Sequence, residues 1–132
     1  MKILLSALFF LAGSTVMLGA EQKPLTVTAD DNGKILTVKV GHEVVVLLKG
    51  NPTTGYTWLL AGIEGPSVAL DGKVQYKENP HPEGMVGVPG MFQAKFKAFQ
   101  PGKSTVRMEY RRPWEKNQKP IKTFEVSLSV EK

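Results

Sequence analysis

Few side chains in this chain of 132 residues could carry out catalysis, because it has no cysteine and only two histidines. His42 lies beside Glu43 at the expected start of a strand, where neighbouring side chains point to opposite faces. His81 lies between two prolines in a loop. A nucleophile needs a base beside it, and a zinc site needs several ligands together. The sequence offers neither arrangement, so we expect a binding protein that is not an enzyme and uses no metal or cofactor.

Residues 51–55, with the sequence NPTTG, could instead fill a cleft on another protein. Pro52 fixes its own φ and pushes Asn51 out of the helical region. Gly55 permits a positive φ, and the two threonines before it have few rotamers to lose. These residues predict a stiff, uncharged tip. The turn signals alone are more typical of an ordinary connection between strands, so other observations must give the tip a function.

Two further loops, at 78–91 and 111–119, have unusual composition. The first contains three prolines, three glycines and two methionines, and the second contains Arg112, Pro113 and Trp114. An exposed tryptophan beside an arginine is typical of an interface anchor. The alternative is a tryptophan folded back over the edge of the domain with the arginine stacked on it.

The segments between these loops alternate apolar and polar residues, which predicts short strands. We expect strands near residues 25–29, 36–40, 43–48, 56–60, 74–76, 92–98, 105–110 and 122–130, and a connection with at most one helical turn at 61–72. Tyr56 and Trp58 share one face of their strand and would anchor the 51–55 loop in the core. The pattern predicts an all-β, immunoglobulin-like sandwich of seven to eight strands without a disulfide. In that topology the 51–55 and 111–119 loops meet at one end, and the 78–91 loop joins them only if the strand before it bends or the loop is long enough to reach.

The N-terminus has the pattern of a secretory signal peptide. Lys2 precedes an apolar run from Ile3 to Leu11 and a stretch rich in small residues that ends at Ala20. We expect cleavage after Ala20, with a cut near Ser14 as the alternative. Residues 21–132 would then be a single exported domain, periplasmic or secreted.

Charge and composition exclude several classes of partner. Lysine and arginine outnumber aspartate and glutamate by 17 to 12, but the charges are scattered and form no long basic run. A nucleic-acid partner is therefore not expected. The absence of cysteine also excludes a lipoprotein anchor. We expect a monomer that has no contact with the membrane once the signal peptide is removed.

Three motifs together resemble those of the chagasin family of cysteine-peptidase inhibitors. They are NPTTGYTW at 51–58, Gly87-Val88-Pro89-Gly90, and Arg112-Pro113-Trp114, in the family's order and at comparable spacing. The resemblance extends over essentially the whole of 21–132. The second motif departs from the family pattern, because Pro89 stands where the family has glycine and thereby removes a backbone donor.

The resemblance implies a tight, reversible, non-covalent inhibitor of papain-like cysteine peptidases, whose loops 51–55, 78–91 and 111–119 occlude the active-site cleft. Thr53 and Thr54 would lie nearest the catalytic cysteine, and Trp114 would pack on an aromatic surface on the leaving-group side. The 87–90 motif would lie on the acyl side. The implied peptidase-binding residues are Asn51, Pro52, Thr53, Thr54, Gly55, Gly87, Val88, Pro89, Gly90, Arg112, Pro113 and Trp114.

Two other functions remain as alternatives at this point. In a glycan-binding module, Tyr56, Trp58 and Trp114 would form stacking platforms for sugars. In a scaffold domain without an active surface, the joint presence of three motifs would be unexplained. Burial of Tyr56 and Trp58 favours the inhibitor, and their alignment in an exposed groove favours the glycan-binding module.

Overall fold

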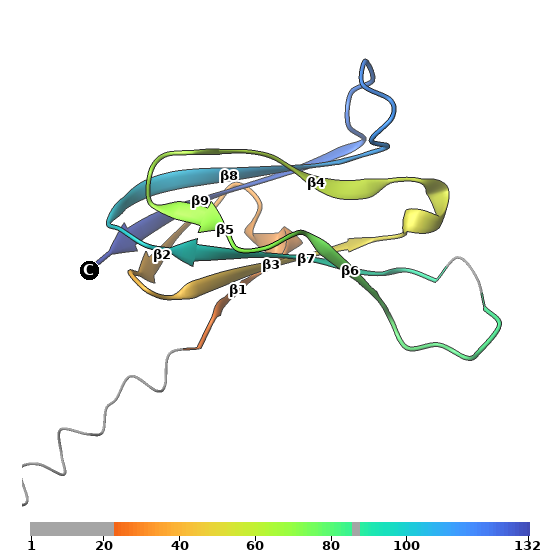
Figure 1. Cartoon of the computed structure of the whole chain (residues 1–132), viewed down its shortest axis with the longest axis horizontal. Coiled ribbons are helices and arrows are strands. Elements are labelled where there is room, and N and C mark those ends of the chain that lie inside the picture. The colour runs from red at the N-terminus through yellow and green to blue at the C-terminus, as the bar shows by residue number, and fades with distance from the viewer. Residues whose placement is uncertain (1–22, 86–87) are drawn as a thin grey trace, which may run out of the picture.

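The computed structural model describes residues 23–85 and 88–132, so the expected signal peptide at 1–20 and Gly87 lie outside the described residues. Within these ranges the chain forms nine strands and two short 3-10 helices (Figure 1). The strands are β1 Leu25–Val27, β2 Ile35–Lys39, β3 Glu43–Gly50, β4 Thr57–Glu64, β5 Val68–Leu70, β6 Gln75–Glu78, β7 Gly90–Ala98, β8 Gly102–Arg111 and β9 Lys122–Glu131. The 3-10 helices are η2, Ala29–Asp31, and η3, Pro52–Thr54. Neither described helix combines the length and apolar character that a membrane span requires.

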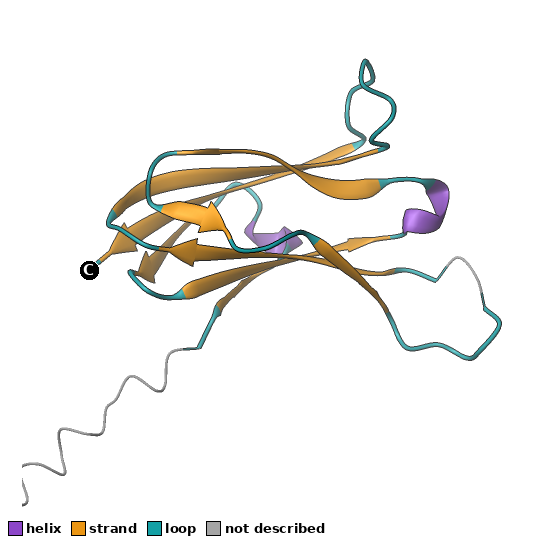
Figure 2. Ribbon diagram, in the orientation of Figure 1, coloured by secondary structure: helices purple, strands orange, loops and turns teal. Residues whose placement is uncertain are grey.

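The strands form two sheets that pack face to face (Figure 2). One sheet has the order β1-β3-β7-β5, with β6 also paired to β7, and the other has the order β2-β9-β8-β4. The chain crosses from the first sheet to the second through η2, and β1 and β2 each pair in parallel with their neighbour. This is an immunoglobulin-like sandwich, as the sequence predicted, with nine described strands in place of seven to eight.

Alternating side chains on the long strands fill the space between the sheets. In β7, β8 and β9 every second residue is buried, as expected for strands that show one face to the core and one to solvent. The largest fully buried side chains include Phe96, Met108, Phe124 and Leu128. The core therefore consists of apolar packing from both sheets, in a chain that has no disulfide.

Two sequence-based assignments were wrong. Residues 61–72 are not a plain connection, because β4 continues to Glu64 and β5 follows at once. A shift of register between Leu60 and Gly62 interrupts the alternation of β4, and β5 has only three residues, too few to show a period. Ala29 begins η2 and does not extend the first strand.

Three connections lie at one end of the sandwich, away from the C-terminus (Figure 1). They are the β3–β4 loop (51–56), the β6–β7 loop (79–89) and the β8–β9 loop (112–121). The sequence predicted that the first and third share an end. The second reaches the same end because β6 and β7 pair as far as Glu78 and Gly90, which delivers the loop there.

Candidate functional site

The β3–β4 loop has the backbone that its sequence predicts. Asn51 is extended, with φ −141° and ψ 95°, and its side-chain Oδ1 accepts hydrogen bonds from the Thr53 amide (3.1 Å) and hydroxyl (2.6 Å). Pro52 starts the 3-10 turn, and Gly55 ends it with a left-handed φ of 89°. The asparagine thus caps the turn that follows it.

Three carbonyl groups of this loop accept hydrogen bonds from within the protein. The Asn51 carbonyl accepts from the Thr54 hydroxyl (3.1 Å), and the Pro52 carbonyl accepts from the Gly55 amide (2.9 Å). The Thr54 carbonyl accepts from Nε of Arg112 (3.1 Å). Both threonine hydroxyls donate inside the loop, although both residues are exposed. The tip therefore presents threonine methyl groups on a turn in which these three carbonyls are already bonded.

Aromatic side chains support the loop from below. The Tyr110 hydroxyl accepts a hydrogen bond from the Asn51 amide (2.8 Å), and its ring lies 5.6 Å from Tyr56 and 5.1 Å from Trp58, centroid to centroid. Trp58 is only 5% exposed, and its indole N–H donates to the Lys49 carbonyl (3.0 Å). The predicted anchor is confirmed for Trp58. A row of sugar-stacking aromatic rings is contradicted, since Trp58 is buried and Tyr56 is half-buried.

The Arg112 guanidinium joins the β8–β9 loop to the β3–β4 loop. Besides its bond to the Thr54 carbonyl, it lies 4.6 Å from the Tyr56 ring centroid and 3.4 Å from the Glu115 carboxylate. Trp114 is 66% exposed, and it is Tyr56 that Arg112 stacks on, so the folded-back arrangement is not the one observed. A Cβ added at Gly55 would lie 2.6 Å from Cη2 of Trp114. Glycine is therefore favoured there by its φ, and the indole would have to shift to admit a side chain.

In the β6–β7 loop, two of the predicted contact residues are buried and do not lie at the loop tip. Val88 is 7% exposed, and Gly90 is buried as the first residue of β7, so neither lies at a loop tip. β7 begins earlier than predicted and includes Gly90. Contact of Val88 and Gly90 with a peptidase stays a prediction. Pro89 is exposed, and its carbonyl accepts from the Asn79 amide (3.2 Å). The Tyr76 hydroxyl donates to the Val88 carbonyl (3.2 Å).

Sequence reasoning missed the residues that hold these loops, namely Tyr110, Glu115 and Tyr76. For the two tyrosines the signal was an aromatic residue near the loop end of its strand, with the ring buried at Tyr110 and half-buried at Tyr76 and the hydroxyl bonded to a backbone group. Burial raises the pKa of the Tyr76 phenol, which keeps this donor protonated. In the described part of the chain, no three His, Cys, Asp or Glu side chains gather as a metal site would require.

Comparison with known proteins agrees with this geometry. Residues 37–128 match the model of the chagasin family of peptidase inhibitors, I42. The chain is similar to amoebiasin-1 of Entamoeba histolytica, with 33% identity over 81% of this chain and 100% of that protein. It is also similar to chagasin of Trypanosoma cruzi, with 34% identity over 67% of this chain and 81% of that protein.

Among solved structures, the crystal structure of the cysteine protease inhibitor EhICP2 from Entamoeba histolytica is similar, with a TM-score of 0.70 and 30% identity. The match covers 86% of this chain and all of that one. Peptidase inhibition, and not catalysis, is therefore the activity of its relatives, as the sequence led us to expect. The chain belongs to the chagasin family of peptidase inhibitors.

Proposed function

We propose that this protein inhibits papain-like cysteine peptidases reversibly and without a covalent bond, by inserting its three clustered loops into the active-site cleft. Membership of the chagasin family supports this proposal, as does the similarity to a cysteine protease inhibitor of known structure. In this arrangement Thr53 and Thr54 face the catalytic cysteine, with Trp114 to one side and Pro89 to the other.

The observation that carries the proposal is that three backbone carbonyls of the β3–β4 loop already accept hydrogen bonds from within the protein. A peptidase cuts a peptide whose carbonyl meets both the thiolate and the oxyanion donors. Here the carbonyls of Asn51, Pro52 and Thr54 accept hydrogen bonds from within the protein, and the chain between them is a 3-10 turn. Productive binding at any of these three carbonyls would require its hydrogen bond to break. The loop can therefore fill the cleft without reaching the geometry for cleavage.

Preorganisation and exposed apolar surface would supply the affinity. Asn51, Tyr110 and Arg112 hold the loop in one conformation before binding, so little flexibility is lost on association. Trp114 offers a large, exposed ring at the edge of the same surface. Buried aromatic anchors of this kind carry much of the energy in protein interfaces.

The test is a titration of papain with the domain of residues 21–132, followed by analysis of the inhibitor for cleavage. We expect reversible, stoichiometric inhibition with the inhibitor intact. Asn51→Ala removes the oxygen that caps the turn and should turn the loop into a slowly cleaved substrate, whereas Asn51→Asp keeps an acceptor there and should resist cleavage. Absence of inhibition at micromolar concentration would refute the proposed function.

We also propose that residues 1–20 direct export and that the mature protein acts in the periplasm or outside the cell. The basic residue, apolar run and small residues of this segment support the proposal. Determination of the N-terminal residue of the protein recovered outside the cytoplasm tests it. Protein that starts at residue 1 and stays in the cytoplasm would contradict export.

A further inference from the structure

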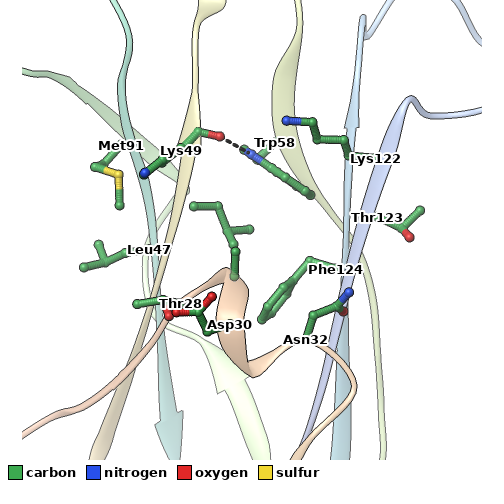
Figure 3. Close-up of a pocket in the computed structure, with 12 residues that line it drawn as sticks. Thr28, Asp30, Asn32, Leu47, Lys49, Trp58, Met91, Lys122, Thr123 and Phe124 are labelled. Atoms are coloured by element: carbon green, nitrogen blue, oxygen red, sulfur yellow. Dashed lines mark hydrogen bonds between the residues drawn. The ribbon is translucent and has the colours of Figure 1, made fainter.

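A pocket of about 660 Å³ opens beneath the loop end, at the edge where the two sheets separate (Figure 3). β1 pairs with β3 only as far as Val46, and the chain then turns into η2 and crosses to the other sheet. The described residues place no strand beside the last four residues of β3 on that side. The pocket occupies this space, and its volume lies in the range of roughly 300–1,000 Å³ that is usual for small-molecule sites.

The walls of the pocket are mainly apolar and come from both sheets. Leu48 on β3, Trp58 on β4 and Phe124 on β9 are core residues that also line it. The half-buried Leu47 and Met91 extend the apolar surface around the edge of β3. These walls therefore favour a ligand with a hydrocarbon portion that can be buried against them.

The charges of the pocket are separated between its two ends. Lys49 and Lys122, one from each sheet, lie at the end nearer the loops, on either side of Trp58, while Asp30 lies at the opposite end, on η2 (Figure 3). Among the described ion pairs none involves these two lysines, and both residues are exposed. The Lys122 ammonium lies 5.7 Å from the centroid of the Tyr110 ring. Their flexible stems let both ammonium groups approach one ligand.

We propose that this pocket binds an anionic amphiphile, a medium-chain fatty acid, with its carboxylate between Lys49 and Lys122 and its tail on Leu48, Trp58 and Phe124. The negative charge of Asp30 at the far end opposes the reverse orientation. A cationic amphiphile would meet the two ammonium groups, and a small inorganic anion would leave the apolar walls unused. The inference does not depend on peptidase inhibition, because no residue at a loop tip takes part in it.

Trp58 is a reporter inside the proposed site. The chain has two tryptophans, so Trp114→Phe in the domain of residues 21–132, which holds all the described strands, leaves Trp58 as the single indole. Fluorescence is followed while decanoate is added below its micellar concentration, with decyltrimethylammonium as the ligand of opposite charge. We expect a saturable change with decanoate. Binding of the cation should be at least about tenfold weaker, because a positive head group is repelled by the two lysines.

Two double variants of equal net charge distinguish specific binding in the pocket from non-specific attraction of an anion to a basic protein. Lys49→Gln/Lys122→Gln should weaken decanoate binding about tenfold, as two partly exposed charge contacts are lost. Lys95→Gln/Lys97→Gln removes two exposed lysines of β7 that do not line the pocket and should leave binding unchanged. Equal weakening by both pairs, equal binding of the cation, or no saturable change would overturn the proposal.

Discussion

The β3–β4 and β6–β7 loops end at the same surface but are held in different ways. The first is short and is fixed along its length, by Asn51 from inside and by Tyr110 and Arg112 from neighbouring strands. The second spans 79–89, and its described residues, 79–85 and 88–89, are tied mainly at the base, where the Asn79 amide bonds to the Pro89 carbonyl. A loop fixed throughout favours tight and uncleaved binding, whereas a loop fixed at its base can adjust to different partners.

The largest effect is expected where the base of the β6–β7 loop is closed. A Cβ at Gly90 would lie 2.3 Å from the Lys77 carbonyl oxygen and 2.7 Å from Cα of Glu78, both backbone atoms that cannot swing away. Gly90→Ala should therefore force β6 from β7 and lower the free energy of unfolding by about 2–3 kcal/mol, as overpacking does. Urea denaturation measures this change.

Gly55→Ala is the matched substitution in the β3–β4 loop. Its Cβ would meet the tip of the Trp114 ring, which can move, so the main penalty is the left-handed φ of 89°. We expect a loss of stability of about 1 kcal/mol. If Gly55→Ala destabilised the protein more than Gly90→Ala, the close contact of Gly90 with the backbone of β6 would not be what holds the β6–β7 loop.

Trp114→Ala tests whether the exposed indole beside the rigid β3–β4 loop supplies binding energy. The indole is 66% exposed and packs mainly against Gly55, so its removal should leave stability within about 0.5 kcal/mol of wild type. Inhibition of papain should weaken by about 2 kcal/mol, or about 30-fold, if the ring is buried by the peptidase. Equal inhibition constants for the variant and wild type would remove Trp114 from the interface.

Arg112→Gln should separate positioning from contact. The variant loses the bond to the Thr54 carbonyl and the contact with the Tyr56 ring, so the β3–β4 loop loosens and inhibition weakens about tenfold. Slow cleavage of the variant would show that the loop has relaxed, a result that loss of a surface contact alone would not give. Arg107→Gln is the control, because Arg107 pairs with Glu64 and Glu125 on the outer face of the sheet. Equal effects of the two substitutions would contradict a specific link between the loops.

The local part of this arrangement could be predicted from sequence. Pro52 and Gly55 have conformational preferences that act within the turn, and alternation along β7 and β9 depends only on neighbouring residues. The contacts that hold the loop could not be predicted in the same way. Tyr110 and Asn51 are 59 residues apart, and Arg112 and Thr54 are 58 apart. No local pattern specifies which strand end a tyrosine hydroxyl or a guanidinium will reach.

The burial of Val88 and Gly90 shows a second limit of local patterns. Glycine has no side chain with which to display strand alternation, so the start of β7 is not visible in the sequence. The three-residue β5 is missed for a related reason, since a period of two needs more residues to appear. Sequence therefore located the three loops but did not separate the residues at their tips from those beneath them.

The smallest expected effect is a pH dependence of inhibition that arises from His81 in the β6–β7 loop. His81 donates to the Pro82 carbonyl (2.9 Å) and to the Glu78 carboxylate (3.4 Å) when both ring nitrogens carry protons, and these acceptors raise the pKa of the imidazole above about 6.5. A raised pKa means that the stabilisation is fully present below pH 6.5 and is lost as the pH rises through the folded-state pKa.

His81→Gln should therefore weaken inhibition about twofold at pH 5.5 and less at pH 8, because only the protonated imidazole donates to Glu78 and Pro82 at the same time. The measurement is the ratio of the inhibition constants of variant and wild type at each pH, which cancels the pH dependence of the peptidase itself. His42→Gln is the matched control, since His42 precedes β3 at the opposite end of the sandwich from the three loops. A ratio for His81→Gln that stayed constant with pH would show that this ion pair does not hold the β6–β7 loop. The described contacts that hold this loop would then be the Asn79–Pro89 bond, the Tyr76–Val88 bond and the close packing of Gly90.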